Sequence, residues 1–312
     1  AFPADDEVLY TSREDALLAT SEPLVVSFIA RDPARGSVAE YGLLAFENHR
    51  RYALAHGMDY AVRTRAYPGE PRMVRWHKLR LLRSLLPCGH SWLFWTDADA
   101  VFTRCDVQLW DQVRAAAGTA PAGWLLQPLR KPLPDIYFVG DQNLFLNSGQ
   151  LLLRNGRWAQ ALLEEAWGRF GSNASLGGEC GGRNDNGAIL LTLARGSLDL
   201  CVSRLRNFTT TAGDCARRMR SVPWPLRRRL WCLPQTALNS YPDEGTTLPP
   251  PEKPEWRRDP SGRFAHVTFG MRRRRFWGTW LPGHFRLHAA GPQDLKARII
   301  RRALARANAT SC

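Results

Sequence analysis

Hydrophobic and polar positions alternate in blocks that predict strands followed by helices along the first part of the chain. The apolar run Leu24–Ala30 is flanked by proline and by a polar Arg-Asp-Pro stretch, which is typical of a buried strand. Apolar residues recur at helical spacing over residues 37–56, and Gly57 supplies a stop. Residues 60–64 predict a second strand, and an amphipathic helix that ends at Pro87 follows. This alternation predicts an α/β fold with a mostly parallel central sheet flanked by helices.

The most informative segment is an aromatic strand that ends in two aspartates. Residues 91–96 read Ser-Trp-Leu-Phe-Trp-Thr, and Asp97 and Asp99 follow. Ligands of α/β sheets bind at the carboxyl ends of parallel strands, and the i, i+2 spacing lets both carboxylates face one ion. A hard cation with oxygen ligands would neutralise a diphosphate there. Such a pair of aspartates also arises by chance in turns. Glycosidases use paired carboxylates as well, but theirs lie several ångströms apart across a sugar, so the i, i+2 pair fits one shared cation better.

The second half of the chain is less regular. Residues 124–128 and 149–154 predict further strands, and apolar positions over residues 158–167 predict a helix. Residues 171–186 are rich in glycine, serine and asparagine and predict a loop. Proline dominates residues 222–258, so we expect an irregular C-terminal elaboration that wraps the first sheet. No clean linker divides the chain, which favours a single domain.

Composition excludes some classes of protein and leaves others open. With 312 residues, 44% hydrophobic and 23% charged, the chain is not wholly disordered. Its 43 lysines and arginines against 29 acidic residues give a net charge of +14, which attracts polyanions and phosphorylated ligands. Arginine clusters at residues 227–229 and 272–275 lie in no recognisable nucleic-acid-binding motif. We therefore expect a solvated or acceptor-facing basic surface and no nucleic-acid partner.

Cysteine and glycosylation patterns point to an oxidising compartment. The seven cysteines lack paired C-x-x-C spacing, which argues against a metal-thiolate site. Four of them lie between residues 180 and 232, where we expect at least one disulfide. N-x-S/T sequons at Asn173, Asn207 and Asn308 fit the lumen of the secretory pathway. No apolar run approaches the ~20 residues needed to span a bilayer, so we expect an ectodomain whose membrane anchor lies upstream.

Several segments together resemble glycosyltransferase family 34, the galactosyl/xylosyl/α-1,6-mannosyltransferase group with a GT-A fold. They occur in the family's order, and the ordered set is more specific than any one of them. The matching segments are residues 52–57, 76–79, 92–103, 146–149, 152–155 and 234–242.

The resemblance implies a metal site. Asp97 and Asp99 would be the metal and sugar-nucleotide aspartates, and His266 resembles the family's late histidine, which completes the metal site. An imidazole is a suitable ligand for Mn²⁺. The family's histidine is followed by two residues, a glycine and a cysteine, whereas three residues separate His266 from Gly270. Without the resemblance, a lone histidine beside aromatic residues is more often a packed core residue.

The resemblance also implies catalytic residues at the start of a helix. Asp185 and Asn186, before an apolar run, align with the family's acidic-Gln segment, in which asparagine here replaces glutamine. They would stabilise the positive charge that develops on the transferred sugar. A helix N-cap explains the same residues, because Asn and Asp satisfy free amides there, and both roles are compatible.

Four further residues resemble donor-binding positions of the family. Asn147, Ser148 and Gly149 resemble an Asn-Thr-Gly loop beside the donor sugar, and Lys78 resembles a lysine near the donor. An ordinary turn and a solvated helix residue are the alternative interpretations.

The function implied by the resemblance is that of a metal-dependent retaining glycosyltransferase. It would move a sugar from a nucleotide diphosphate, expected to be a UDP-sugar, to a hydroxyl of a glycan or glycoprotein, with Mn²⁺ or Mg²⁺ as cofactor. The α/β GT-A-like domain would span residues 22–290. A stem remnant or linker would precede it at residues 1–21, and a basic, helical tail would follow at residues 291–312.

We expect this protein in the Golgi lumen, as the ectodomain of a type II membrane protein, alone or as a homo- or hetero-oligomer. Three alternatives stay open at this point. A catalytically inactive glycosyltransferase-like partner subunit would keep the same fold. A basic polyanion-binding protein would explain the charge without the two aspartates, and a metal-dependent hydrolase would release free sugar.

Overall fold

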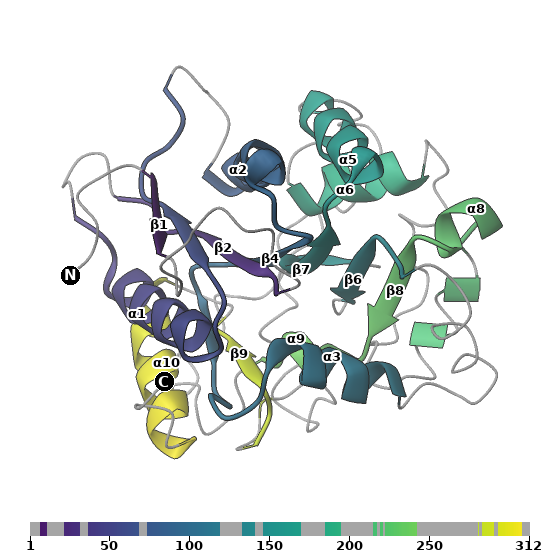
Figure 1. Ribbon diagram of the computed structural model, residues 1–312. Coiled ribbons are helices and arrows are strands. Elements are labelled where there is room, and N and C mark those ends of the chain that lie inside the picture. Colours follow the sequence, from purple (N-terminus) through teal and green to yellow (C-terminus); the bar gives the residue numbers. More distant parts are fainter. Residues whose placement is uncertain are drawn as a thin grey trace, which may run out of the picture.

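The computed structural model describes residues 7–10, 22–31, 37–68, 74–118, 133–140, 146–169, 185–194, 215–216, 219–220, 222–241, 280, 283–289 and 293–307. A seven-stranded sheet with the order β1-β3-β2-β4-β7-β6-β8 lies at the centre of this part of the chain (Figure 1). A separate two-stranded sheet is formed by β5 and β9. The strands are β1 Glu7–Tyr10, β2 Leu24–Phe28, β3 Tyr60–Arg63, β4 Trp92–Thr96, β5 Ala100–Phe102, β6 Ile136–Val139, β7 Asn147–Arg154, β8 Leu230–Leu233 and β9 Arg286–His288.

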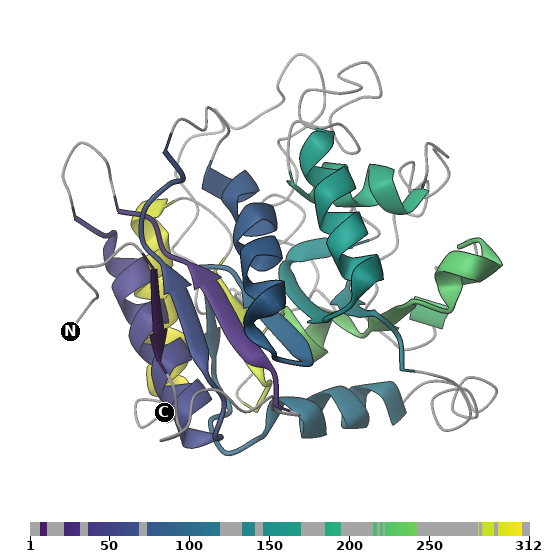
Figure 2. The same ribbon diagram turned by 45° about the horizontal axis from the view of Figure 1, so that its top comes forward.

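Helices cover both faces of the central sheet. The helices α2, α5 and α6 pack on one face, and α1 and α3 pack on the other (Figures 1 and 2). The predicted α/β fold, with a central sheet flanked by helices, is therefore confirmed. The helices are α1 Glu40–Ala55, α2 His77–Leu85, α3 Leu109–Gly118, α5 Arg157–Gly168, α6 Asp185–Ala194, α8 Trp224–Arg227, α9 Gln235–Leu238 and α10 Gln293–Arg306, with 3-10 turns η1 Val74–Trp76 and η2 Leu86–Cys88.

The sheet is mixed, whereas the sequence pattern predicts a mostly parallel one. β2 runs parallel to β3 and β4, and β6 runs parallel to β8. β7 is antiparallel to both β4 and β6, and β1 is antiparallel to β3. The connection from β6 to β7 spans only residues 140–146, which is too short for the crossover of about a dozen residues that a parallel pair needs.

β4 is the strand that carries the two aspartates to the edge of the sheet. All five of its residues are buried. Leu93 and Trp95 pack under α2 and α5, while Trp92 and Phe94 belong to the core on the opposite face. A strand with both faces covered reads as a continuous apolar run, which explains its aromatic sequence. The first charged side chain beyond this run, Asp97, therefore emerges where the core ends.

The C-terminal part is more regular than its proline content predicts. Residues 222–241 contain β8, which pairs with β6, and α9, whereas residues 242–258 lie outside the described residues. The apolar segment Leu230–Leu233 is only four residues long, so a composition dominated by proline hides it. A disulfide joins Cys215 to Cys232 of β8, which confirms the bridge expected among these cysteines. The sequons and the predicted strand at residues 124–128 lie outside the described residues.

The helix α10 is integrated into the core. Its apolar residues pack with α1, β5 and β9 in one cluster that includes Ala45, Val101, Leu287 and Ile300. Figures 1 and 2 both show α10, in yellow, alongside α1. The division of the chain at residues 21 and 290 stays a prediction. Among the described helices, none combines the length and the apolar character needed to cross a bilayer.

We expect Ile300→Ala to lower the free energy of unfolding by about 2–5 kcal/mol, because it leaves a cavity between α10 and α1. Ile300 is fully buried, whereas Arg298 on the same helix is exposed. Arg298→Ala should change the unfolding free energy by less than about 0.5 kcal/mol. Urea unfolding monitored by tryptophan fluorescence measures both, and equal effects would contradict the docking of α10.

Candidate metal and donor site

The turn between β4 and β5 holds the two aspartates in a fixed conformation. The Asp97 amide donates to the Gly149 carbonyl at 3.0 Å, and the Ala100 amide donates to the Asp97 carbonyl at 3.1 Å. On the other side, the Ala289 amide donates to the Asp99 carbonyl at 2.7 Å. Strands from two sheets therefore fix the turn.

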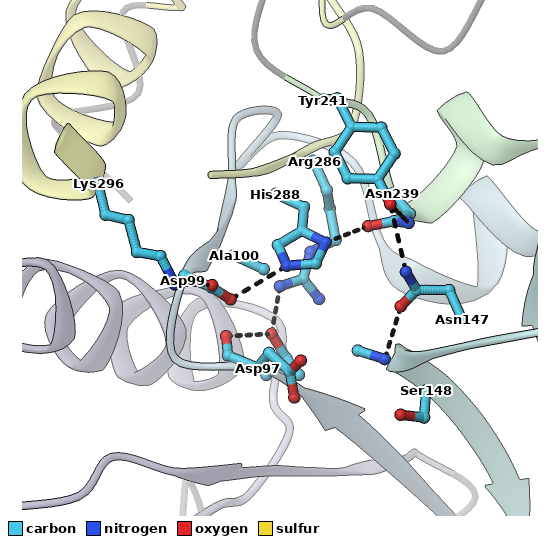
Figure 3. Close-up of polar contacts among 12 residues, drawn as sticks. Asp97, Asp99, Ala100, Asn147, Ser148, Asn239, Tyr241, Arg286, His288 and Lys296 are labelled. Carbon is cyan, nitrogen blue, oxygen red and sulfur yellow. Dashed lines mark hydrogen bonds and ion pairs between the residues drawn. The ribbon is translucent and has the colours of Figure 1, made fainter. Parts of the chain in front are cut away.

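Asp97, Asp99 and His288 form a candidate metal site (Figure 3). One ligand atom from each residue lies within 4.8 Å of the others. His288 is the last residue of β9 and pairs with Ala100, the residue directly after Asp99, so the sheet of β5 and β9 brings the imidazole to the turn. The side chains of Asp97 and Asp99 are 29% and 15% exposed, so neither carboxylate is fully covered by protein.

Hydrogen bonds orient the imidazole of His288. Its Nδ1 lies 2.7 Å from the Asn239 Oδ1, and its Nε2 lies 3.1 Å from the Asp99 Oδ1. An amide oxygen can only accept, so the ring donates from Nδ1 and Nε2 faces the aspartates. Metal-binding histidines are held in this way, with the second ring nitrogen donating to an oxygen.

The same network reaches the predicted donor residues on β7. The Asn147 Nδ2 donates to the Tyr241 hydroxyl at 3.3 Å, and the Asn239 Nδ2 donates to the same hydroxyl at 3.5 Å. The Asn147 Oδ1 accepts from the Gly149 amide at 2.7 Å. The segment at residues 147–149, which the sequence alone would also allow as an ordinary turn, is the beginning of β7.

Lys78 links Asp97 to the beginning of α6. Its Nζ lies 3.1 Å from the Asp97 Oδ1, 2.7 Å from the Asp185 Oδ2 and 3.0 Å from the Ser148 Oγ. Lys78 is buried, so it is not the solvated helix residue of the alternative interpretation. Burial alone would lower the pKa of Lys78, but Asp185 and Asp97 outweigh it and raise the pKa. Lys78 is therefore a charged link between two carboxylates.

The beginning of α6 also contacts β7. Asp185 accepts a short hydrogen bond from the Ser148 hydroxyl, and the Asn186 Oδ1 accepts from the Ser148 amide at 2.6 Å. Asp185 lies in the first turn of α6, where the helix dipole favours a carboxylate. The structure thus brings both predicted catalytic residues to the segment that carries the predicted donor residues.

Asp99 has a cationic partner from the C-terminal helix. The Lys296 Nζ lies 2.5 Å from the Asp99 Oδ2. Burial would raise the pKa of Asp99, but His288 and Lys296 together lower it well below its usual range. Asp99 is therefore ionised at neutral pH, as a metal ligand must be.

A buried arginine contacts the residue that precedes the turn. Arg286 precedes His288 by two residues on β9, so both side chains point to the same side of that strand. Its Nη2 donates a short hydrogen bond to the Thr96 hydroxyl, directly before Asp97, and its guanidinium lies 4.1 Å from the centroid of the Phe102 ring. Burial lowers the pKa of Arg286 to about 9, so it stays charged at neutral pH. The guanidinium is a fixed positive charge beneath the aspartates.

The site fits a divalent cation. Two carboxylates and an imidazole are oxygen and nitrogen donors, which suit Mn²⁺ and, for the oxygens, Mg²⁺. A Cβ atom added at Gly149 would lie 2.9 Å from the Asp97 Oδ2 and 3.4 Å from the His288 Cε1. A glycine at this position therefore leaves the space beside the ligand atoms clear of side chain.

The histidine predicted from the sequence is not the one that the described structure brings to the aspartates. His266 lies outside the described residues, and its role stays a prediction. His288 occupies the position next to Asp99 and is followed by Ala-Ala-Gly. This gives the spacing of two residues before a glycine that the family's late histidine shows. The spacing before Gly291 is thus the signal in the sequence that points to His288.

We expect Lys78→Met to lower the free energy of unfolding by about 3–5 kcal/mol, because it leaves two carboxylates without their shared cation. The double variant Lys78→Met/Asp185→Asn should recover part of this loss, since the amide removes one of the two buried charges. Urea unfolding at neutral pH measures the effect. A double variant no more stable than the single one would show that the ion pair is not what Lys78 contributes.

We expect Gly149→Ala to weaken Mn²⁺ binding by about tenfold or more, because the added methyl group displaces the Asp97 carboxylate or the Asn147 amide. Gly156→Ala is the matched control, since an added Cβ there meets nothing within 4 Å. Mn²⁺ titration followed by electron paramagnetic resonance compares the two variants with the wild type. Unchanged binding in Gly149→Ala would place the ion elsewhere.

Comparisons with known proteins were made for sequence and for structure. No protein-family model matches the chain. Probable glycosyltransferase 3 of Oryza sativa subsp. indica is 30% identical over 153 residues, which are 48% of this chain and 30% of that protein. Xyloglucan 6-xylosyltransferase 1 of Arabidopsis thaliana is 28% identical over 163 residues, which are 51% of this chain and 33% of that protein. The matched segment thus spans about a third of the length of these relatives.

Among solved structures, a glycosyltransferase involved in the glycosylation of the major capsid of PBCV-1 matches 90% of this chain and 100% of its own, with a TM-score of 0.48 and 10% identity. From the sequence matches, the chain is a distant homologue of plant xyloglucan 6-xylosyltransferases and probable glycosyltransferases, as its resemblance to glycosyltransferase family 34 predicts.

Proposed function

We propose that this chain is a metal-dependent glycosyltransferase that moves a sugar from a nucleotide diphosphate to a hydroxyl of a glycan or glycoprotein. The observation that supports this most directly is the convergence of Asp97, Asp99 and His288 at the end of a buried strand. Retention of the anomeric configuration follows from the family resemblance. The distant homologues named xylosyltransferases favour a UDP-sugar, with UDP-xylose as the first donor to test.

When bound, the divalent ion would neutralise charge on the diphosphate of the donor. The side chains of Asp97, Asp99 and His288 would hold it, and Asn239 would keep the Nε2 of His288 directed at the aspartates. Lys78 keeps Asp97 in place from the side of α2. These residues are positioned before any ligand arrives, which lowers the cost of organising the site during the reaction.

The beginning of α6 is proposed to form the sugar side of the donor site. Asp185 and Asn186 both contact Ser148, which lies between Asn147 and Gly149 on β7. The ion pair between Asp185 and Lys78 holds the carboxylate group beside this segment. In this proposal Asp185 stabilises positive charge on the transferred sugar, and Asn186 fixes the backbone against which the sugar lies.

The compartment that we propose for this activity is the Golgi lumen. The described disulfide is compatible with an oxidising compartment, and Golgi residence would place the chain with nucleotide-sugar donors and with glycan or glycoprotein acceptors. The net charge of +14 would favour the approach of an anionic donor, since a positive surface attracts phosphorylated ligands.

We expect the wild type to release UDP from at least one UDP-sugar in the presence of Mn²⁺. EDTA should abolish this release. Asp99→Asn and His288→Ala should each reduce this rate at least about 100-fold, because each removes a ligand of the ion that stabilises the leaving group. A coupled assay for UDP release, with a panel of UDP- and GDP-sugars, measures the rate.

Two further variants serve as controls for this assay. Asp106→Asn changes an exposed aspartate near the turn that pairs with Arg104, and it should leave the rate unchanged. His266→Ala should also retain activity if His288 alone supplies the imidazole. A wild type that binds Mn²⁺ and nucleotide but turns over no donor would favour the inactive partner subunit instead.

A further inference from the structure

The two aspartates of the turn are each paired with a lysine from a different helix. Lys78 of α2 contacts the Asp97 Oδ1 at 3.1 Å, and Lys296 of α10 contacts the Asp99 Oδ2 at 2.5 Å. The two lysines come from separate parts of the fold, since α2 packs on one face of the central sheet and α10 packs on α1 (Figure 1). The pairs differ in one respect, because Lys78 also contacts Asp185 and Ser148, which fix its position.

Lys296 has a partner to which it can turn when it leaves Asp99. Its Nζ lies 5.2 Å from the centroid of the Tyr41 ring on α1. An ammonium group near an aromatic face is stabilised without a counter-ion, and a lysine side chain has a flexible four-carbon stem. Tyr41 is a partly buried residue that packs against the cluster joining α1 to α10, and this packing holds its ring beside Lys296.

The charges around the turn are close to balance without a metal ion. Among the described residues of this cluster, three carboxylates (Asp97, Asp99, Asp185) meet three cations, the ammonium groups of Lys78 and Lys296 and the guanidinium of Arg286. No net charge therefore remains when His288 is neutral. Removing the charge of Lys296 leaves one net negative charge, and a divalent cation is attracted more strongly to such a cluster than to a neutral one.

We propose that Lys296 is an internal counter-cation that holds Asp99 in the metal-free protein and competes with the divalent ion for this carboxylate. This inference rests on the proposed function, because it assigns a regulator to the proposed metal site. Binding of the ion moves the Lys296 ammonium away from Asp99 and towards the Tyr41 ring. The C-terminal helix thereby sets the metal affinity of the site, and the metal concentration at which the protein becomes loaded.

The decisive experiment is an Mn²⁺ titration of wild type and Lys296→Met, followed by electron paramagnetic resonance of the free ion. Methionine keeps an unbranched side chain against Tyr41 but carries no charge. We expect Lys296→Met to bind Mn²⁺ about tenfold more tightly than the wild type. In the wild type, the apparent affinity for Mn²⁺ is the intrinsic affinity multiplied by the fraction of protein in which Lys296 has left Asp99. Lys296→Arg keeps the charge and should bind no more tightly than the wild type.

Arg298→Met is the matched control, since it removes one positive charge from the exposed side of the same helix. It should bind Mn²⁺ as the wild type does, which separates competition at Asp99 from a general effect of net charge. Thermal melting gives a second measurement. In EDTA, Lys296→Met should melt below the wild type because Asp99 has lost its partner, and saturating Mn²⁺ should raise its melting temperature by more than that of the wild type.

Equal or weaker Mn²⁺ binding by Lys296→Met would overturn the competition. If the wild type nevertheless shows Mn²⁺-dependent release of UDP, the proposed function stands and only the role of Lys296 is wrong. If neither protein binds Mn²⁺, the competition and the proposed metal site both fail. A wild type that binds Mn²⁺ weakly and a variant that binds it tightly would support the proposal, whatever the donor is.

Discussion

The structure depends on holding two neighbouring carboxylates, Asp97 and Asp99, at the end of a fully buried strand. β4 carries apolar and aromatic side chains on both faces, so Asp97 and Asp99 emerge at the border of two hydrophobic cores. A carboxylate at such a border is stable only if cations or donors offset the cost of its desolvation. The fold supplies them from elements that are far apart in the sequence: Lys78 on α2, His288 on β9 and Lys296 on α10.

This constraint explains why the last part of the chain belongs to the core. β9 reaches the turn by pairing with β5, and α10 packs on α1 through an apolar surface. Within β9, alternate residues serve the two ends of the turn: Arg286 contacts Thr96 before the first aspartate, and His288 contacts the second. β9 therefore fixes one side of the turn, and β7 fixes the other through the bond from the Asp97 amide to the Gly149 carbonyl.

The sequence predicts local elements well where one physical signal dominates. The continuous apolar run of β2, the helical spacing of α1 and the aromatic run of β4 all form the elements that their patterns predict. The direction in which strands pair is harder to predict from the sequence, because an apolar strand such as β7 has the same hydrophobic pattern whichever way it runs. β8 is too short to stand out among the prolines around it.

The residues of the candidate site also differ in how far the sequence alone identifies them. The position of the aspartates at the end of an apolar strand identifies them from the sequence, whereas the segments around Ser148 and Asp185 are identified by their resemblance to the family. Lys296 is different, since nothing in its neighbourhood distinguishes it from the other basic residues of an amphipathic helix. Only the packing of α10 against α1 brings it to Asp99.

The two lysine–aspartate ion pairs of the site differ in how firmly the lysine is held. Lys78 is fixed by three contacts with Asp185 of α6 and Ser148 of β7, so it gives Asp97 a permanent counter-charge. Of the two aspartates, Asp99 is therefore the one that can exchange its cation. Lys296, with Asp99 on one side and the Tyr41 ring on the other, is the cation that can be exchanged. The asymmetry between two otherwise similar ion pairs thus separates a structural role at Asp97 from an adjustable one at Asp99. It also joins the affinity of the metal site to the docking of the C-terminal helix, because any change that loosens α10 weakens the competitor of the ion.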